Sequence, residues 1–176
     1  MAGTQSYIGI KNGVVLCVNH YLGYDMNGLF YHGYSEEPVR FADAAELLRK
    51  LENLFDILNF PHAATNDRNF EDDIKLSKRR KKPRVVERPL TVNRRHENER
   101  ERVMSDKEIL TKHGDAGTFI VRVQQRQNSS WQGRITWVDE DKTVYFRSVF
   151  EMMKLIDDAL KQGENPEEAS AEMHWE

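Results

Sequence analysis

Four arginines, two glutamines and a tyrosine recur in the second half of the chain with a spacing that could bind an anion. If residues 118–124, 131–138 and 143–147 form neighbouring strands, alternate side chains point to opposite faces of the sheet. One face then carries Arg122, Gln124, Arg126, Gln132, Arg134, Tyr145 and Arg147. Guanidinium groups bind phosphate and carboxylate through paired hydrogen bonds, and a tyrosine ring offers a stacking surface. The pattern predicts a polyanion or nucleotide site. It leaves two alternatives open, which are an ordinary solvated face and a contact with acidic surface of the first part of the chain.

A second basic feature lies in the middle of the chain. Residues 75–102 contain 12 Lys or Arg and four Glu, a net charge of +8, which leaves −11 on the rest of the chain. Such segregation favours a polyanionic partner or docking on acidic protein surface. The densest run supplies candidate phosphate contacts at Arg79, Arg80, Lys81, Lys82 and Arg84. Each such contact would make binding depend on salt, and a solvated linker is the alternative.

The strands that would carry the arginines belong to a pattern that occurs twice. Residues 28–55 align with residues 133–160 at a constant offset of 105 without a gap. Each stretch combines apolar alternation with a capping box and then apolar residues at helical spacing. The capping boxes are Asp43-x-x-Glu46 and Ser148-x-x-Glu151, and they obey the same offset. The sequence therefore predicts an α+β fold in which two copies of a small antiparallel sheet-plus-helix unit, βββα-like, pack as an internal pseudo-dimer.

Four segments follow from this pattern. We expect a first sheet-plus-helix unit at residues 1–61, a charged and largely solvated connector with short helices at 62–112, a second unit at 113–162 and an acidic tail at 163–176. The two sheets could be joined edge to edge, or the two helices could pack face to face. One unit alone would bury little apolar surface, which is why pairing is expected.

Residue types that support catalysis are scattered. The six histidines lack the spacing of a metal-binding helix, and neither a phosphate-binding loop nor a nucleophile elbow is present. Cys17 is the single cysteine and falls in an apolar stretch, so we expect a buried thiol rather than a nucleophile. These patterns predict a protein that is not an enzyme and that uses no metal or cofactor.

The apolar segments of the sequence are short. No run approaches the roughly 18 apolar residues that a membrane span needs. The N-terminal residues lack a basic stretch followed by an apolar one, which is the pattern of a secretion signal. We therefore expect a cytoplasmic protein that does not bind membranes.

One short motif resembles a known receptor family. Residues 128–133, Asn-Ser-Ser-Trp-Gln-Gly, are similar to the [DN]-x-S-x-x-G turn of PilZ receptors for cyclic dinucleotides. That family combines the turn with an R-x-x-x-R linker. Arg80 and Arg84 have this spacing, and so do other arginine pairs of this chain. A predicted helix follows Gly133 too soon for a PilZ barrel, so the chain is not assigned to that family.

We expect a non-catalytic regulatory or accessory protein that binds nucleic acid through the Arg/Gln-rich sheet face and the basic connector. Its paired architecture resembles small single-strand binders of the coactivator type, an analogy of topology only. A protein-interaction adaptor or homo-oligomer is one alternative. Its contact surface would be the aromatic and apolar outer face of the first unit: Cys17, Asn19, Tyr21, Asn27, Leu29, Tyr31 and Arg40. A receptor for a small phosphorylated ligand, such as a cyclic dinucleotide, is the other.

Overall fold

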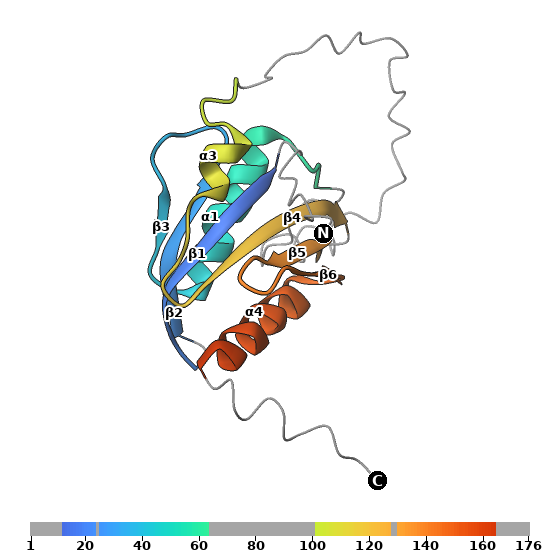
Figure 1. Cartoon of the computed structure of the whole chain (residues 1–176). Helices are drawn as coiled ribbons and strands as arrows, with labels where there is room; N and C mark the ends of the chain where they lie inside the picture. The colour runs from blue at the N-terminus through green and yellow to red at the C-terminus, as the bar shows by residue number, and fades with distance from the viewer. Residues whose placement is uncertain (1–11, 24, 64–100, 128–129, 165–176) are drawn as a thin grey trace, which may run out of the picture.

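The computed structural model describes residues 12–23, 25–63, 101–127 and 130–164, and its centre is one antiparallel sheet. Six strands lie in the order β3-β2-β1-β4-β5-β6, so that β1 and β4 occupy the middle and β3 and β6 the edges (Figure 1). The predicted α+β class is confirmed, and the sheets of the two halves are joined edge to edge. Their packing as an internal pseudo-dimer stays a prediction.

Each half contains three strands followed by a helix. The first half consists of β1 (Gly13–Leu22), β2 (Asp25–His32), β3 (Val39–Phe41) and α1 (Ala44–Leu58). The second consists of β4 (Gly117–Gln127), β5 (Ser130–Trp137), β6 (Lys142–Phe146) and α4 (Val149–Glu164). A short helix, α3 (Asp106–Leu110), precedes β4.

Both long helices begin at the predicted capping boxes. At α1, the Asp43 carboxylate accepts the N–H of Glu46 at 2.7 Å, while the Glu46 carboxylate accepts the N–H of Ala42. At α4, the Ser148 hydroxyl accepts the N–H of Glu151, whose carboxylate accepts the N–H of Arg147 at 2.6 Å. The Asp43 and Ser148 oxygens each satisfy one N–H of the first helical turn, while each Glu carboxylate accepts from the residue just before the N-cap instead of from the N-cap itself.

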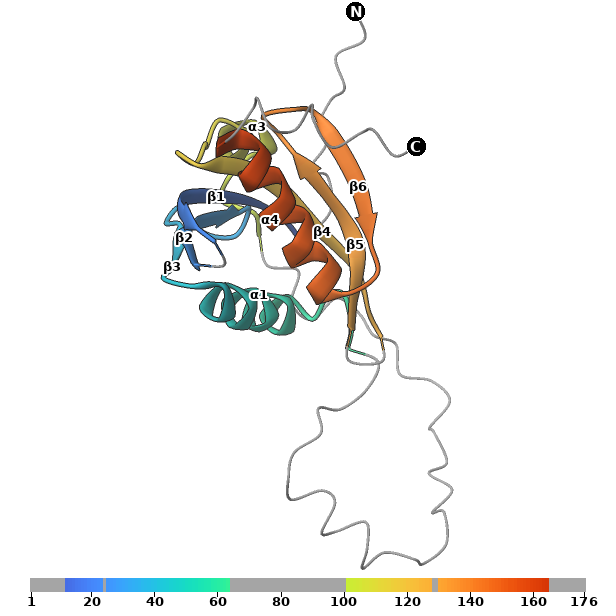
Figure 2. The ribbon, with the colours of Figure 1, turned by 90° about the horizontal axis from the view of Figure 1, so that it is seen from below.

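The main core lies between the sheet and these two helices, which cover the same face (Figure 2). We call this side the helix face. Alternate residues of the central strands form the sheet side of this core, and one apolar stripe of each helix forms the opposite side. The fully buried contributors include Val14, Leu16, Phe119, Val121, Leu47, Leu51, Phe55, Met152 and Ile156. The helices therefore depend on the sheet for their burial, and the sheet depends on them.

A β-bulge interrupts the alternation in each central strand. The register shifts between Val18 and His20 in β1 and between Val123 and Gln125 in β4. An extra residue reverses the side to which every later side chain points. Tyr21, opposite Met26, therefore joins the helix-face core, although strict alternation places it on the other side.

The strand registers of the two halves correspond at the offset seen in the sequence. Val18 pairs with Gly28 in the first half, and Val123 pairs with Gly133 in the second. Between the halves, Val15 of β1 lies opposite Ile120 of β4, and these two residues are themselves 105 apart. Strand pairs, bulges and caps thus share one offset.

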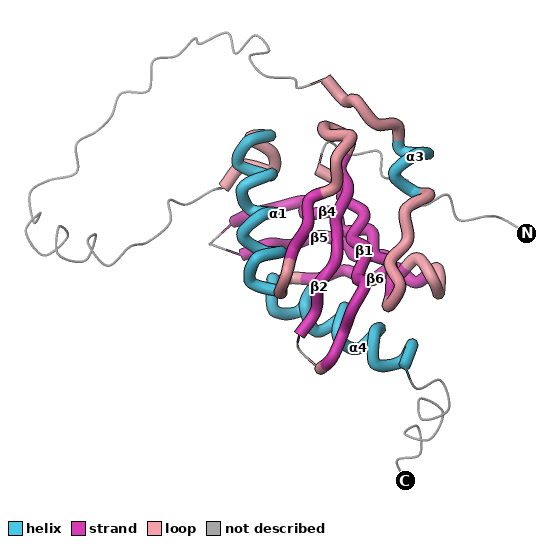
Figure 3. Tube along the Cα trace, turned by 90° about the vertical axis from the view of Figure 1, so that its left-hand side faces the viewer, coloured by secondary structure: helices cyan, strands magenta, loops and turns pink. Residues whose placement is uncertain are grey.

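The opposite face of the sheet is covered in its middle by residues 101–116, which we call the α3 segment (Figure 3). Ile109, fully buried, packs against Val15, Cys17 and Ile120. The predicted burial of Cys17 is confirmed. Burial, with a smaller contribution from Asp139, raises the pKa of its thiol to about 11.

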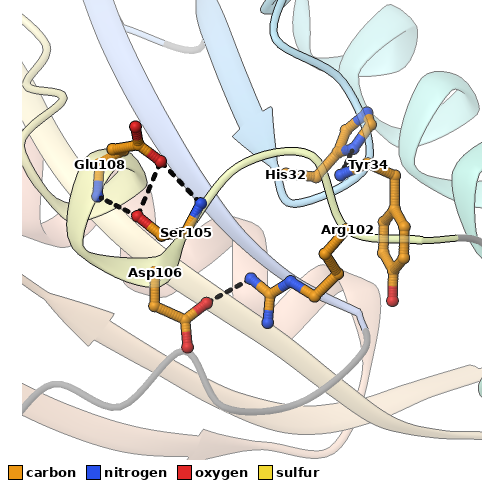
Figure 4. A network of polar contacts seen from close by, with 6 residues as sticks. All are labelled: His32, Tyr34, Arg102, Ser105, Asp106 and Glu108. Carbon is orange, nitrogen blue, oxygen red and sulfur yellow. Dashed lines mark hydrogen bonds and ion pairs between the residues drawn. The ribbon is translucent and has the colours of Figure 1, made fainter.

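Backbone and side-chain contacts anchor the α3 segment. The carbonyl of Gly33 accepts the N–H groups of Val103 and Met104 at 2.8 and 3.2 Å. A side chain at Gly33 would collide with the guanidinium of Arg102, which also forms an ion pair with Asp106 (Figure 4). Ser105 starts α3 with a third capping box.

A buried histidine closes the end of β2 beside this segment. His32 is 9% exposed, and its Nδ1 accepts the N–H of Tyr34 at 3.2 Å (Figure 4). Burial lowers the pKa of His32, which favours the neutral ring that this hydrogen bond requires. The contact is structural, since it fixes the turn that leads to β3.

Gly28 and Gly133 should resist substitution. An added Cβ would collide with the carbonyl oxygens of Cys17 and Arg122, respectively, and with the rings of Phe41 and Phe146. We expect Gly28→Ala and Gly133→Ala each to lower the free energy of unfolding by about 1–3 kcal/mol, the usual cost of overpacking. Urea unfolding measures it.

Gly163→Ala is the matched control, because nothing lies within 4 Å of the added Cβ in α4. Its stability should stay unchanged or rise by up to about 1 kcal/mol, since Ala favours a helix over Gly. Equal stability of all three variants would contradict the tight strand packing.

Candidate anion-binding site

Three of the predicted residues form a row across the second half of the sheet, on the face opposite α1 and α4. Arg122 of β4 lies directly opposite Arg134 of β5, and Arg134 lies directly opposite Tyr145 of β6. We call Arg122, Arg134 and Tyr145 the arginine row. Directly opposed residues in antiparallel strands point to the same face with Cβ atoms about 4.5–5.5 Å apart. Strand pairing therefore holds the three side chains together.

The two guanidinium groups lack the partners that buried charges usually have. Both arginines are half-buried, and the Nε atoms of both are buried without a hydrogen-bond partner in the described part of the chain. Neither forms an ion pair with a described carboxylate. Burial, and then the neighbouring charge of Arg134, lower the pKa of Arg122. Two like charges directly opposite each other are destabilising, and desolvation increases that cost.

The row ends in an aromatic ring on one side and faces a carboxylate on the other. The Arg134 guanidinium lies 5.7 Å from the ring centroid of Tyr145, within cation–π range, and Tyr145 is 67% exposed. On the other side, the charge of Asp106 in α3 partly offsets the lowered pKa of Arg122. Asp106 itself is paired with Arg102 (Figure 4). The α3 segment thus lies at the Arg122 side of the row, and its Asp106 offsets the positive charge there only in part.

Such a row can bind an anion without any catalytic step. Guanidinium groups donate in a fixed, planar geometry that matches phosphate and carboxylate oxygens. A bound anion would offset the repulsion between Arg122 and Arg134 and supply an acceptor for their unpaired donors. The exposed ring of Tyr145 could stack against a base next to a bound phosphate.

The two predicted glutamines lie at the solvent-exposed end of the same strands. Gln132 is exposed and lies opposite Gln125, which continues the row's face after the bulge. Gln124 is exposed at the bulge itself, so its predicted place in the alternation does not hold. Gln125, which the sequence pattern missed, takes the position expected for Gln124.

Arg126 requires a correction, because the bulge in β4 turns it to the helix face. It is only 4% exposed, and its Nη1 donates to Glu52 and Asp56, each at 2.7 Å. Its Nε donates to the carbonyl of Pro61 at 2.7 Å. Arg126 therefore ties α1 to the second half of the sheet and is not available to a ligand.

Arg147 lies apart from the row, just before α4. It is 85% exposed, and its guanidinium is paired with Glu151 at 3.0 Å. That hydrogen bond raises the pKa of Arg147 and lowers the pKa of Glu151. The sequence placed it with the other arginines, but its charge is already matched by a carboxylate on the helix side.

The outer face of the first half differs from the expected open apolar surface. Cys17 and Tyr31 pack with the α3 segment, and Tyr21 belongs to the helix-face core. Asn19 and Arg40 are exposed, whereas Asn27 and Leu29 are half-buried. The docking surface expected for an adaptor is thus partly occupied by the chain itself. The basic run Arg79, Arg80, Lys81, Lys82 and Arg84 lies outside the described residues.

Concave features occur on the other side of the molecule. Cavities of about 210, 450 and 640 Å³ all have residues of α4 in their lining, joined by strand residues in the first, by Tyr21, Met26 and Ala44 in the second and by Arg147 and Ser148 in the third. The arginine row lines none of these three. In the described ranges, no group of three or more His, Cys, Asp or Glu side chains is arranged to hold a metal. None of the described helices combines the length and apolar character needed to cross a membrane.

With this geometry established, the chain was compared with known proteins. Protein families, curated proteins and solved structures give no match.

The arginine row should cost stability when no anion is bound. We expect Arg122→Met to raise the free energy of unfolding by about 1 kcal/mol, since a long apolar side chain removes a like-charge contact and a desolvated charge. Salt should stabilise the original protein more than this variant, because it screens the repulsion. Thermal melts at low and high salt measure both effects.

Arg147→Met is the control for that measurement. It breaks an exposed pair with Glu151 and should destabilise the protein only slightly, because exposed ion pairs contribute little to stability. A loss of stability in Arg122→Met larger than that in Arg147→Met would contradict the description of the row as strained.

Proposed function

We propose that this protein is a non-catalytic nucleic-acid-binding protein of regulatory or accessory type. Its binding platform would consist of Arg122, Arg134 and Tyr145, extended by Gln132. The observation that supports this most is the directly opposed pair of half-buried arginines without a described carboxylate partner. Such an arrangement costs stability, and a phosphate would remove the cost.

The exposed ring beside the arginines favours a single strand over a duplex. Bases of a single strand are free to stack on an aromatic side chain, which contributes roughly 1–3 kcal/mol per base. Tyr145 lies next to Arg134 with most of its ring accessible. A single bound nucleotide would place its phosphate on Arg122 and Arg134 and its base on Tyr145.

The shape of the site favours an extended ligand over an enclosed small molecule. Small-molecule sites are usually concave and enclose most of their ligand. The arginine row instead lies across three strands of an open sheet, and the three cavities described above are on the α4 side. We therefore place a receptor for a cyclic dinucleotide second.

The basic run at Arg79, Arg80, Lys81, Lys82 and Arg84 would add phosphate contacts outside the sheet. Its sequence supports this role, because it concentrates positive charge without interspersed carboxylates.

We also infer that the two halves are copies of one unit, packed as an internal pseudo-dimer. Strand pairs, bulges and helix caps that share the offset of 105 support this. In this view the helix face serves folding in both copies. The opposite face has diverged, apolar under α3 in the first copy and basic in the second.

Binding to a fluorescent single-stranded oligonucleotide tests the proposal. At about 50 mM salt, where electrostatic binding is strong, the protein should bind, and affinity should fall as salt rises. Replacing both Arg122 and Arg134 by Ala should lower the slope of log K against log salt by roughly 1.4, since each lost phosphate contact removes about 0.7. Fluorescence anisotropy over a salt series gives both values.

Arg147→Ala is the matched control, since its guanidinium is already paired with Glu151. It should change the slope far less than the double variant. Absence of binding at about 50 mM salt would contradict the proposal. If a cyclic or linear dinucleotide competes as strongly as the oligonucleotide, the small-ligand alternative replaces it.

A further inference from the structure

The two edges of the sheet are unequal. At one edge, β3 has three residues and follows Pro38, which has no N–H to offer a neighbouring strand. At the other, β6 has five residues and contains no proline. Within the described ranges, no strand pairs with the outer side of either. Proteins usually blunt exposed edges with proline, charge or short strands, and β3 combines all three, whereas β6 has only its short length and Lys142 at one end.

The sequence offset shows where the edges differ. Pro38 corresponds to Thr143, and Arg40 corresponds to Tyr145, whereas Val39 corresponds to Val144. The first edge thus carries a proline and a charge where the second carries a threonine and an aromatic ring. Both substitutions make β6 better suited to pairing, because β-branched and aromatic residues favour strands.

The exposure of Val144 identifies the side chain that β6 leaves uncovered. Val144 lies opposite Ile135, on the helix face, and is 44% exposed. Val39 is better covered and packs against the main core. Beside Val144, a cavity of about 210 Å³ runs between β6 and α4, and its lining includes Trp137 and Leu155. An adjoining strand would cover this apolar strip.

The charges at the ends of β6 suit a second copy of the same strand. In an antiparallel pairing centred on Val144, Thr143 would lie opposite Tyr145 of the second copy, and Asp141 opposite Arg147. Asp141 and Arg147 are both exposed and of opposite charge, and Arg147 would then contact Asp141 in addition to its own Glu151. A two-fold arrangement repeats every contact, so two such charge pairs would frame the paired strands.

We propose that β6 pairs with β6 of a second copy, in an antiparallel arrangement centred on Val144. The two sheets then continue as one across the symmetry axis. The arginine rows of both copies lie on the same face of this continuous sheet. The proposal rests on the edge alone and stands whether or not the row binds nucleic acid.

Sedimentation velocity tests the proposal directly. From about 1 to about 100 µM, a range that reveals interfaces of micromolar affinity, the protein should reach twice its monomer mass of 20.6 kDa. Val144→Glu should stay monomeric, because two carboxylates would meet on the axis. Val103→Glu is the matched control. Val103 is an exposed valine of the α3 segment, 55% exposed, and this variant should still dimerise.

A monomeric original protein over this range would overturn the proposal, as would dimerisation of a folded Val144→Glu. If Val144→Glu does not fold, Val144→Cys decides. Directly opposed residues of antiparallel strands have Cα atoms about 4.5–5.5 Å apart, within the range that a disulfide spans, so mild oxidation should form an intermolecular disulfide. Cys17 would not interfere, since it is 1% exposed. Val103→Cys should remain uncrosslinked, and failure of Val144→Cys to crosslink would overturn the proposal.

Discussion

Backbone pairing between β1 and β4 turns two three-stranded meanders into a single sheet. Six residue pairs join them, from Gly13 opposite Arg122 to Val18 opposite Gly117. A three-stranded sheet with one helix buries little apolar surface, so neither half has a sufficient core alone. Once joined, the central strands are covered by both long helices on one face and by Ile109 on the other. The shared core between the sheet and the two long helices depends on this pairing being in register.

The same pairing explains why the two halves present different surfaces. The α3 segment covers the apolar middle of the sheet at Val15, Cys17 and Ile120, and it stops where Asp106 approaches Arg122. Beyond that point, β4, β5 and β6 carry the arginine row without a covering element among the described residues. Two half-buried guanidinium groups that lie directly opposite each other lower the stability of the fold. Binding of an anion gives a physical reason for that cost, whereas the buried Arg126 of the helix face is already paired with Glu52 and Asp56.

Local patterns in the sequence predicted more of the fold than of the candidate site. Asp43, Glu46, Ser148 and Glu151 marked both helix starts, and the offset of 105 matched the strand registers. The bulges were missed, because an inserted residue has no local signature in a sequence treated as strictly alternating. That omission misplaced Tyr21 and Arg126 and put Gln124 where Gln125 belongs. The position of α3 was also beyond local patterns, since Ile109 meets Val15 across a long sequence separation and a capping box does not say where its helix packs.

Side-chain NMR of arginine Nε–H groups tests the arginine row as the binding site most directly. Signals can be assigned with single Arg→Lys variants and followed while a single-stranded oligonucleotide is added. The account predicts that the Nε–H signals of Arg122 and Arg134 shift together, because these buried groups gain an acceptor. The signal of Arg126 should stay in place, since its Nε already donates to Pro61. Binding that leaves Arg122 and Arg134 unchanged would contradict the account.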